Sequence, residues 1–267
     1  MVEITAQRLA AAAQSLKHAG QWAQACDLLG AAAAAGPSER AVLAVAAAEV
    51  CVDRDFWCLT TTADAALSRA STAVAEVAPA EDTLRWDLDL QYLRHDYFGQ
   101  LQSPDGPRFG PEGRDPAVLE DLAARSRRLR ALAPDGERTA TATFYAGLVE
   151  DNLRDDHVAG EGLFAEALTV AEEADAELAA SEALRHLGYW SSQHGDPDLA
   201  REQWERSTRL RQRAGAVPYV LAQFLLLAGL ARDAGDEAKA RTLASEVRAW
   251  ALALGLGPLA AQARDLA

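Results

Sequence analysis

Apolar positions recur at helical spacing along nearly the whole chain, in segments that end at glycine, proline or aspartate. Trp86, Leu90, Leu93 and Tyr97, for example, follow the spacing i, i+4, i+7, i+11, which places them on one face of a helix. Abundant alanine and sparse β-branched residues favour an all-α fold. We expect six helical pairs and a short segment after Pro258. The pairs are 5–19 with 22–34, 38–53 with 59–77, 81–100 with 116–133, and three that turn at 155–156, 195–196 and 235–236.

A 40-residue repeat connects the three C-terminal pairs. Their turns read Asp155-Asp156, Gly195-Asp196 and Gly235-Asp236. Large residues at 144, 184 and 224, and small residues at 160, 200 and 240, share this register. The clearest copies are therefore residues 141–180, 181–220 and 221–260, and a period in this range is typical of stacked helical repeats.

The second copy carries a family resemblance. Leu184, Leu187-Gly188, Ala200 and Trp204 resemble the tetratricopeptide pattern of a large residue, Leu-Gly, a small residue and an aromatic. Its period is longer than the usual value of about 34 residues and is similar to that of tetratricopeptide-like arrays in bacterial regulators. The resemblance implies one right-handed α-α superhelix, or solenoid, over residues 1–267. It also implies that the first helix of each hairpin lines a concave groove.

Charge and cysteine content exclude several functions. A net charge of −14 argues against binding to nucleic acid or to an anionic membrane surface, because both require clustered basic residues. The three cysteines lack C-x-x-C spacing, so we expect neither disulfides nor a zinc site. The first residues carry no basic stretch typical of a signal peptide, and no segment approaches the length of a membrane span, so we expect a cytoplasmic protein.

The third hairpin, residues 81–133, departs from the pattern. Residues 81–116 contain no alanine, and residues 102–116 form a link rich in proline and glycine. Such a link is either a lid, with Arg108 and Phe109 at its centre, or a passive insertion. Beside the apolar stripe of helix 81–100 runs a second stripe of mixed polarity. Its members are Asp87, Gln91, Arg94 and Phe98, with His95 at its flank, and we expect them to face a ligand.

Transfer of these groove positions to the other hairpins extends the candidate ligand-binding surface. The additional residues are Gln14, Lys17, Glu49, Tyr145, Asn152, Glu182, Arg185 and Tyr189. Asn152 resembles the asparagine that grips a peptide backbone in many tetratricopeptide domains. The charges are mixed in sign, which disfavours a site dedicated to one acidic C-terminus.

Motifs for catalysis are absent from the sequence: it has no phosphate loop, no Gly-x-Ser-x-Gly and no dinucleotide fingerprint. Asp155-Asp156-His157 resembles a metal-binding triplet, but a hairpin turn favours helix capping by these carboxylates. The arginine clusters 125–130 and 206–213 fall on second helices, where we expect solvated outer faces. We therefore expect no catalytic residue, metal or cofactor.

Two main hypotheses follow, beside a third in which the chain is a purely structural, self-associating array. The first is a non-catalytic module that binds a protein segment or peptide in its concave groove. The second is a small-molecule sensor or enzyme with a pocket on helix 81–100, closed by the loop 102–116.

Overall fold

The computed structural model describes residues 4–34, 36–77, 82–103 and 106–266. Over these residues the chain forms thirteen α-helices and one π-helical turn, with no strand, so the all-α prediction is confirmed. The chain divides into two compact units, one ending at His95 and the other beginning at Asp96, within helix α5 (Asp82–Leu101). One continuous array over 1–267 stays a prediction. Residues 1–3, Glu81, residues 104–105 and residue 267, which belong to predicted segments, lie outside the described residues.

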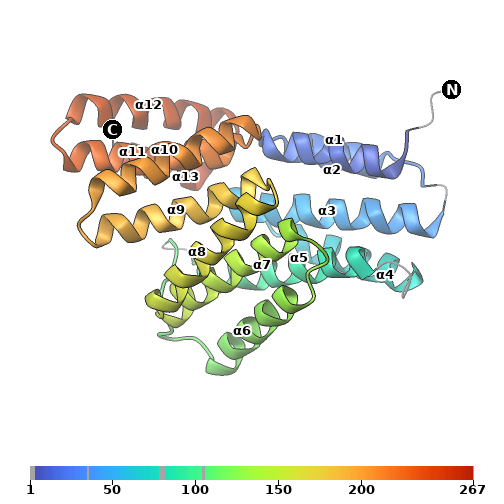
Figure 1. Ribbon diagram of the computed structural model, residues 1–267. Helices are drawn as coiled ribbons and strands as arrows, with labels where there is room; N and C mark the ends of the chain where they lie inside the picture. Colours follow the sequence, from blue (N-terminus) through green and yellow to red (C-terminus); the bar gives the residue numbers. More distant parts are fainter. Residues whose placement is uncertain (1–3, 35, 78–81, 104–105, 267) are drawn as a thin grey trace. The chain divides into compact units, whose positions relative to one another are not determined.

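The described residues of the first unit form four complete helices and the start of α5 (Figure 1). They are α1 (Ala6–His18), α2 (Trp22–Gly30), α3 (Pro37–Cys58) and α4 (Ala63–Val77). Helix α1 packs on α2 and α3, and α3 packs on α4. Helix α3 extends beyond the predicted end at Asp53, because the turn to α4 comes only at Leu59, whose φ is 55°. The thiols of Cys26, Cys51 and Cys58 are free.

The second unit is a series of antiparallel helices. After the end of α5 come α6 (Pro116–Ala131), α7 (Gly136–Leu148), the π-helical turn η1 (Val149–Leu153), α8 (His157–Glu173), α9 (Glu177–Gln193), α10 (Pro197–Arg213), α11 (Val217–Asp233), α12 (Glu237–Ala253) and α13 (Gly257–Arg264). Helices α7 and α8, α9 and α10, and α11 and α12 form hairpins, and each hairpin packs on the next (Figure 1). The predicted pairing of these helices is confirmed.

The turns explain the 40-residue repeat. Asp155, Gly195 and Gly235 adopt positive φ angles of 61°, 80° and 81°, a conformation that glycine adopts without a steric penalty. The aspartate after each of them caps the following helix, since its carboxylate accepts a backbone N–H three residues later. The capping interpretation of residues 155–156 is therefore confirmed for Asp156.

A second series of turns shows that the structural unit is half the predicted period. Asp175, Gly215 and Gly255 also have positive φ, 53°, 66° and 73°. Helices α8 to α12 each contain 17 residues, and each begins 20 residues after the previous one. Sequence reasoning missed this shorter period because only every second turn carries the capping aspartate.

Trp204 anchors the α9–α10 hairpin, as the repeat register predicted. Its side chain is 4% exposed and packs with Ala200 and with Leu230 of the next hairpin. Its ring lies against Gly188, where an added Cβ would come within 2.4 Å of the indole. Gly188 is therefore required by the close approach of the two helices, rather than by its backbone conformation.

Candidate functional site

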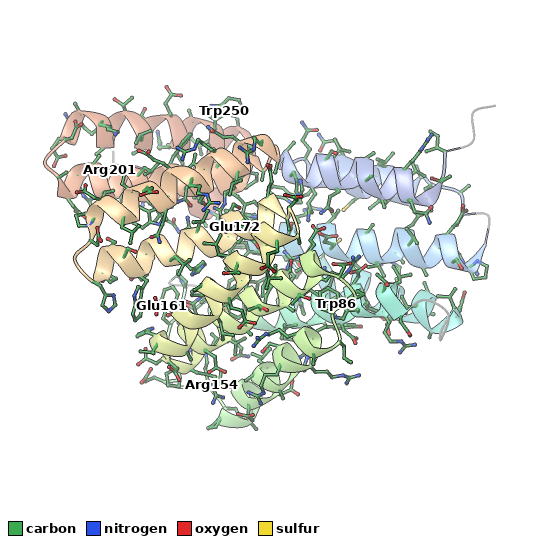
Figure 2. All side chains as sticks on the ribbon, in the orientation of Figure 1. Trp86, Arg154, Glu161, Glu172, Arg201 and Trp250 are labelled. Atoms are coloured by element: carbon green, nitrogen blue, oxygen red, sulfur yellow. The ribbon has the colours of Figure 1, made fainter. Side chains whose placement is uncertain are left out.

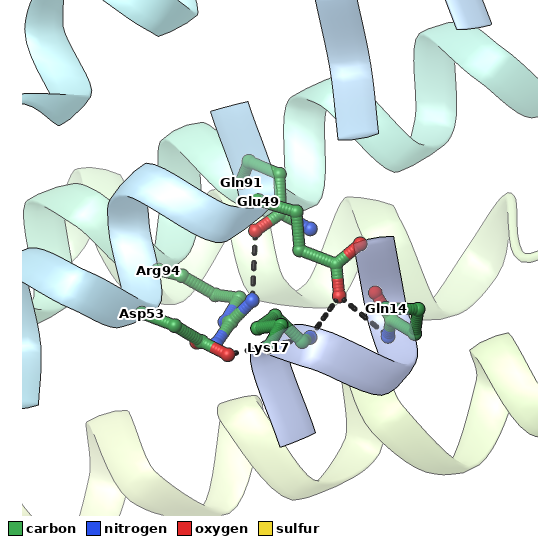
Figure 3. Close-up of polar contacts among 6 residues, drawn as sticks. All are labelled: Gln14, Lys17, Glu49, Asp53, Gln91 and Arg94. Atoms are coloured by element: carbon green, nitrogen blue, oxygen red, sulfur yellow. Dashed lines mark hydrogen bonds and ion pairs between the residues drawn. The ribbon is translucent and has the colours of Figure 1, made fainter. Parts of the chain in front are cut away.

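A buried polar cluster, called here the α1–α3–α5 cluster, joins three helices of the first unit. Its members are Gln14, Lys17, Glu49, Asp53, Gln91 and Arg94 (Figure 3). Lys17 Nζ lies 2.5 Å from Glu49 Oε1 and 3.3 Å from Asp53 Oδ2. Arg94 pairs with the other oxygen of Asp53. Two cations thus balance two carboxylates.

The glutamines complete the hydrogen bonding of the α1–α3–α5 cluster. Gln14 Nε2 donates to Glu49 Oε1 over 3.1 Å, and Gln91 Oε1 accepts from Arg94 Nη1 over 2.8 Å (Figure 3). Buried charges are tolerated only when they are paired and hydrogen-bonded in this way.

The pKa values within the cluster are governed by these pairs. Burial acts to raise the pKa of Asp53, but Arg94 and then Lys17 outweigh it, so the pKa lies below its ordinary value. Glu49 behaves likewise, with Lys17 as the main opposing charge. Burial acts to lower the pKa of Lys17, and Asp53 and Glu49 reverse that effect and raise it. Lys17, Glu49 and Asp53 therefore stay ionised near neutral pH.

Several groove positions predicted on the first three hairpins meet in this cluster, but Lys17, Gln91 and Arg94 are buried and not exposed as predicted. Gln91 and Arg94 are only 4% and 7% exposed. Arg94 is buried because it pairs with Asp53 of α3, a residue that the sequence pattern did not assign to the groove. A usable signal was present, because Asp53 follows Glu49 by four residues and so shares its face of α3. Whether this cluster binds a ligand stays a prediction.

The other predicted residues of α5 lie at the edge of this arrangement. The stripe Trp86, Leu90 and Leu93 is buried, as predicted. Asp87 is half-buried, and half-buried His95 places Nε2 3.0 Å from Asp64 Oδ1.

The link between α5 and α6 is fastened by one arginine. Arg114, 9% exposed, donates to the carbonyl oxygens of Gly110, Gln100 and Arg108. The N–H of Gly110 donates in turn to the carbonyl of Asn152 in η1, over 2.9 Å. The described residues of the link between α5 and α6 thus have a defined conformation. This supports a fixed insertion more than an opening lid.

A second polar cluster lies within the second unit and is called here the arginine pair: Arg185 of α9 and Arg211 of α10. Both donate through Nη1 to the same atom, Oε1 of Gln223 on α11, over 3.2 Å and 3.4 Å. Arg211 also donates to Ser181 Oγ and to the carbonyl of Tyr219. Neither arginine forms an ion pair with a carboxylate in the described part of the chain.

The arginine pair is strongly perturbed electrostatically. Burial, with the repulsion of Arg211 as the second cause, lowers the pKa of Arg185 to about 9. Burial likewise lowers the pKa of Arg211 to about 10, against the opposing effects of Glu182 and Tyr219. Burial, Arg185 and Arg211 together lower the pKa of neighbouring His186 to about 3. The surroundings of these side chains therefore disfavour positive charge.

The remaining predicted groove residues are distributed along α7, η1 and α9. Tyr145 is buried in an aromatic group with Tyr97 and Phe98. Asn152 Nδ2 donates to the hydroxyl of Tyr97 over 2.6 Å. Half-buried Glu182 precedes Arg185 on α9 by three residues, and Tyr189, 55% exposed, follows it by four. These side chains thus come from three different elements of the second unit.

The predicted outer faces are confirmed in most positions. Arg206 and Arg213 of α10, both exposed, pair with glutamates of α8 and α9, and half-buried Arg130 of α6 pairs with Glu166 of α8. Arg211 is the exception, since it is 2% exposed. The repeat register provides the missed signal: the equivalent positions, Ala171 and Ala251, are fully buried alanines.

A hollow of about 330 Å³ lies between α10, α11 and α12. Phe224 and Leu227 of α11 line it, together with the charged side chains Arg201 of α10 and Lys239 of α12. Figure 2 labels Arg201, and also Trp250 on α12, which is 55% exposed.

Comparisons with known proteins do not place this chain in a family. No protein-family model matches the sequence, and no curated protein matches it. Among the described residues, no helix has the length and apolarity needed to cross a bilayer, and no group of three or more His, Cys, Asp or Glu could hold a metal ion.

Proposed function

We propose that this protein is a non-catalytic binding module of the tetratricopeptide-like solenoid type, and that the first helices of its second unit bind a protein segment. The observation that carries the proposal is the mixed face of α9. Glu182, Arg185 and Tyr189 share this face at helical spacing, and Tyr189 is 55% exposed.

The regularity of the second unit supports this proposal. Helices of equal length, packed hairpin on hairpin, hold the face in place before any ligand arrives. A preformed surface loses little conformational entropy on binding, so modest polar and aromatic contacts suffice for affinity. Tyrosine and arginine are also the residues that most often dominate binding energy at such surfaces.

The alternative, a small-molecule pocket on helix 81–100, receives less support. Gln91 and Arg94, which would line that pocket, are engaged in the buried α1–α3–α5 cluster. The described part of the loop 102–116 is fastened by Arg114.

Selection of displayed random peptides on the intact protein tests the proposal. Selected peptides should bind wild type, and their affinity for the Tyr189→Ala variant should be at least tenfold lower. Trp250→Ala is the matched control, because Trp250 is an equally exposed aromatic (55%) on the second helix α12. The affinity of the selected peptides for Trp250→Ala should stay within twofold of their affinity for wild type.

Two outcomes would contradict the proposal. One is that no peptide is enriched over a display selection without the protein. The other is that the selected peptides lose affinity to Trp250→Ala and not to Tyr189→Ala.

A further inference from the structure

The arginine pair is a buried excess of positive charge. Arg211 is 2% exposed and Arg185 is half-buried, yet the acceptor that they share, the amide oxygen of Gln223, is neutral. Elsewhere in the second unit, arginines such as Arg206 and Arg213 pair with glutamates. Two desolvated guanidinium groups without a paired carboxylate are unfavourable unless an anion joins them.

The repeat register shows that the fold does not require these side chains. The positions equivalent to Arg211 are Ala171 and Ala251, both fully buried, and the equivalent of Gln223 in the preceding copy is Ala183, also fully buried. Small residues, with Thr143 at the Gln223 position of the first copy, thus satisfy the packing at these sites. A sequence that breaks its own pattern with buried charge does so most often at a functional site.

Some N–H groups of the two guanidinium groups are still able to donate a hydrogen bond to a ligand. In the described part of the chain, Arg185 donates only through Nη1, and Arg211 through Nε and Nη1. Nη2 of each guanidinium, and Nε of Arg185, therefore remain for a ligand. Because Arg185 is half-buried, part of this residue is reachable from solvent.

We propose that Arg185 and Arg211, positioned by Gln223 and Ser181, form a binding site for an oxyanion, the phosphate or carboxylate group of a ligand. Planar guanidinium groups match the geometry of such oxygens and form charge-assisted hydrogen bonds with them. Gln223 holds the two groups at one point, and Ser181 Oγ fixes the orientation of Arg211 through Nε at 3.2 Å. The proposal goes beyond the binding of a protein segment and does not depend on it.

Calorimetric titration of the whole protein with inorganic phosphate, and separately with acetate, at constant ionic strength tests the site. Wild type should bind phosphate, and Arg185→Gln should weaken that binding at least tenfold. Arg213→Gln is the matched control: this arginine, on the same helix as Arg211, pairs with Glu177 at an exposed position, and its loss should change affinity less than twofold. Phosphate binding without acetate binding assigns a phosphate group, and comparable binding of both assigns a carboxylate.

Thermal unfolding separates this site from a merely structural one. Without anion, Arg185→Gln should melt at the wild-type temperature or above it, because the substitution removes a like-charge repulsion. Added phosphate should raise the melting temperature of wild type and not that of Arg185→Gln. Failure of wild type to bind either anion, equal binding by Arg185→Gln, or a lower melting temperature of Arg185→Gln with no anion effect on wild type would each overturn the proposal.

Discussion

Replacement of Arg94 by methionine tests the α1–α3–α5 cluster. Methionine keeps much of the apolar volume of the arginine side chain but removes its charge. It leaves Asp53, 2% exposed, with Lys17, at 3.3 Å, as its one ion-pair partner among the residues that the structure describes. Removal of one member of a buried ion pair costs about 3–5 kcal/mol. Because Lys17 still compensates part of the charge, we expect a loss near 3 kcal/mol, at the lower end of that range.

Urea titration followed by circular dichroism measures this loss. Arg40→Met is the matched control, since Arg40 pairs with Glu76 in the same unit with 51% and 49% of the two side chains exposed. An exposed pair of this kind contributes about 0–1 kcal/mol. The double variant Arg94→Met/Asp53→Leu should recover most of the stability, because no unpaired charge remains. A loss below about 1 kcal/mol for Arg94→Met would refute the buried network.

The pH dependence has a defined sign. The pKa values of Asp53 and Glu49 are lowered in the folded protein, so the unfolded chain binds protons first as pH falls. Their stabilisation is complete above the unfolded values of about 3.9 and 4.3, and it is lost as pH falls through the lower folded values. Arg94→Met should reduce this dependence on acid, and an unchanged acid limb would argue against the ion pairs.

The remaining predictions concern the repeat geometry, and urea titration checks each of them. Trp204→Ala should cost about 3–5 kcal/mol, because it empties the interhelical space and removes the bond from the indole Nε1 to the carbonyl of Arg185; a loss below about 1 kcal/mol would contradict the packing described here. Gly188→Ala should cost about 1–3 kcal/mol, because its Cβ would approach the Trp204 ring within 2.4 Å, and a neutral result would disprove that close approach. Asp155→Gly should be neutral or stabilising, whereas Asp155→Val should lose about 1–2 kcal/mol at its φ of 61°; equal stabilities would show that the turn does not need this conformation.

The sequence sufficed to predict the helices because their signals are local. Prolines and aspartates mark helix starts such as Pro197 after Asp196, and positive-φ glycines such as Gly195 and Gly235 mark the turns. The same register predicted that Trp204 is buried. It also predicted that Lys17 and Glu49 face the same groove, and these two side chains form an ion pair.

The polar clusters could be predicted only in part, because burial of a charge depends on which partner meets it. Arg94 was expected in solvent, and its partner Asp53 lies 41 residues earlier in the chain. Arg211 was expected on an outer face with its neighbours, and only its acceptors Gln223 and Ser181 explain its burial. The division at residues 95–96 had no signal in the sequence, because it falls within one helix, α5.

The binding face is tested most directly by a photo-crosslinking measurement. A peptide selected on the intact protein would carry a benzophenone group, and mass spectrometry would locate the crosslinked residues after irradiation. We expect crosslinks on the first helices α9 and α11, near Arg185 and Tyr189, and their loss in competition with the unlabelled peptide. Competed crosslinks confined to the second helices α10 and α12, around Trp250, would contradict it.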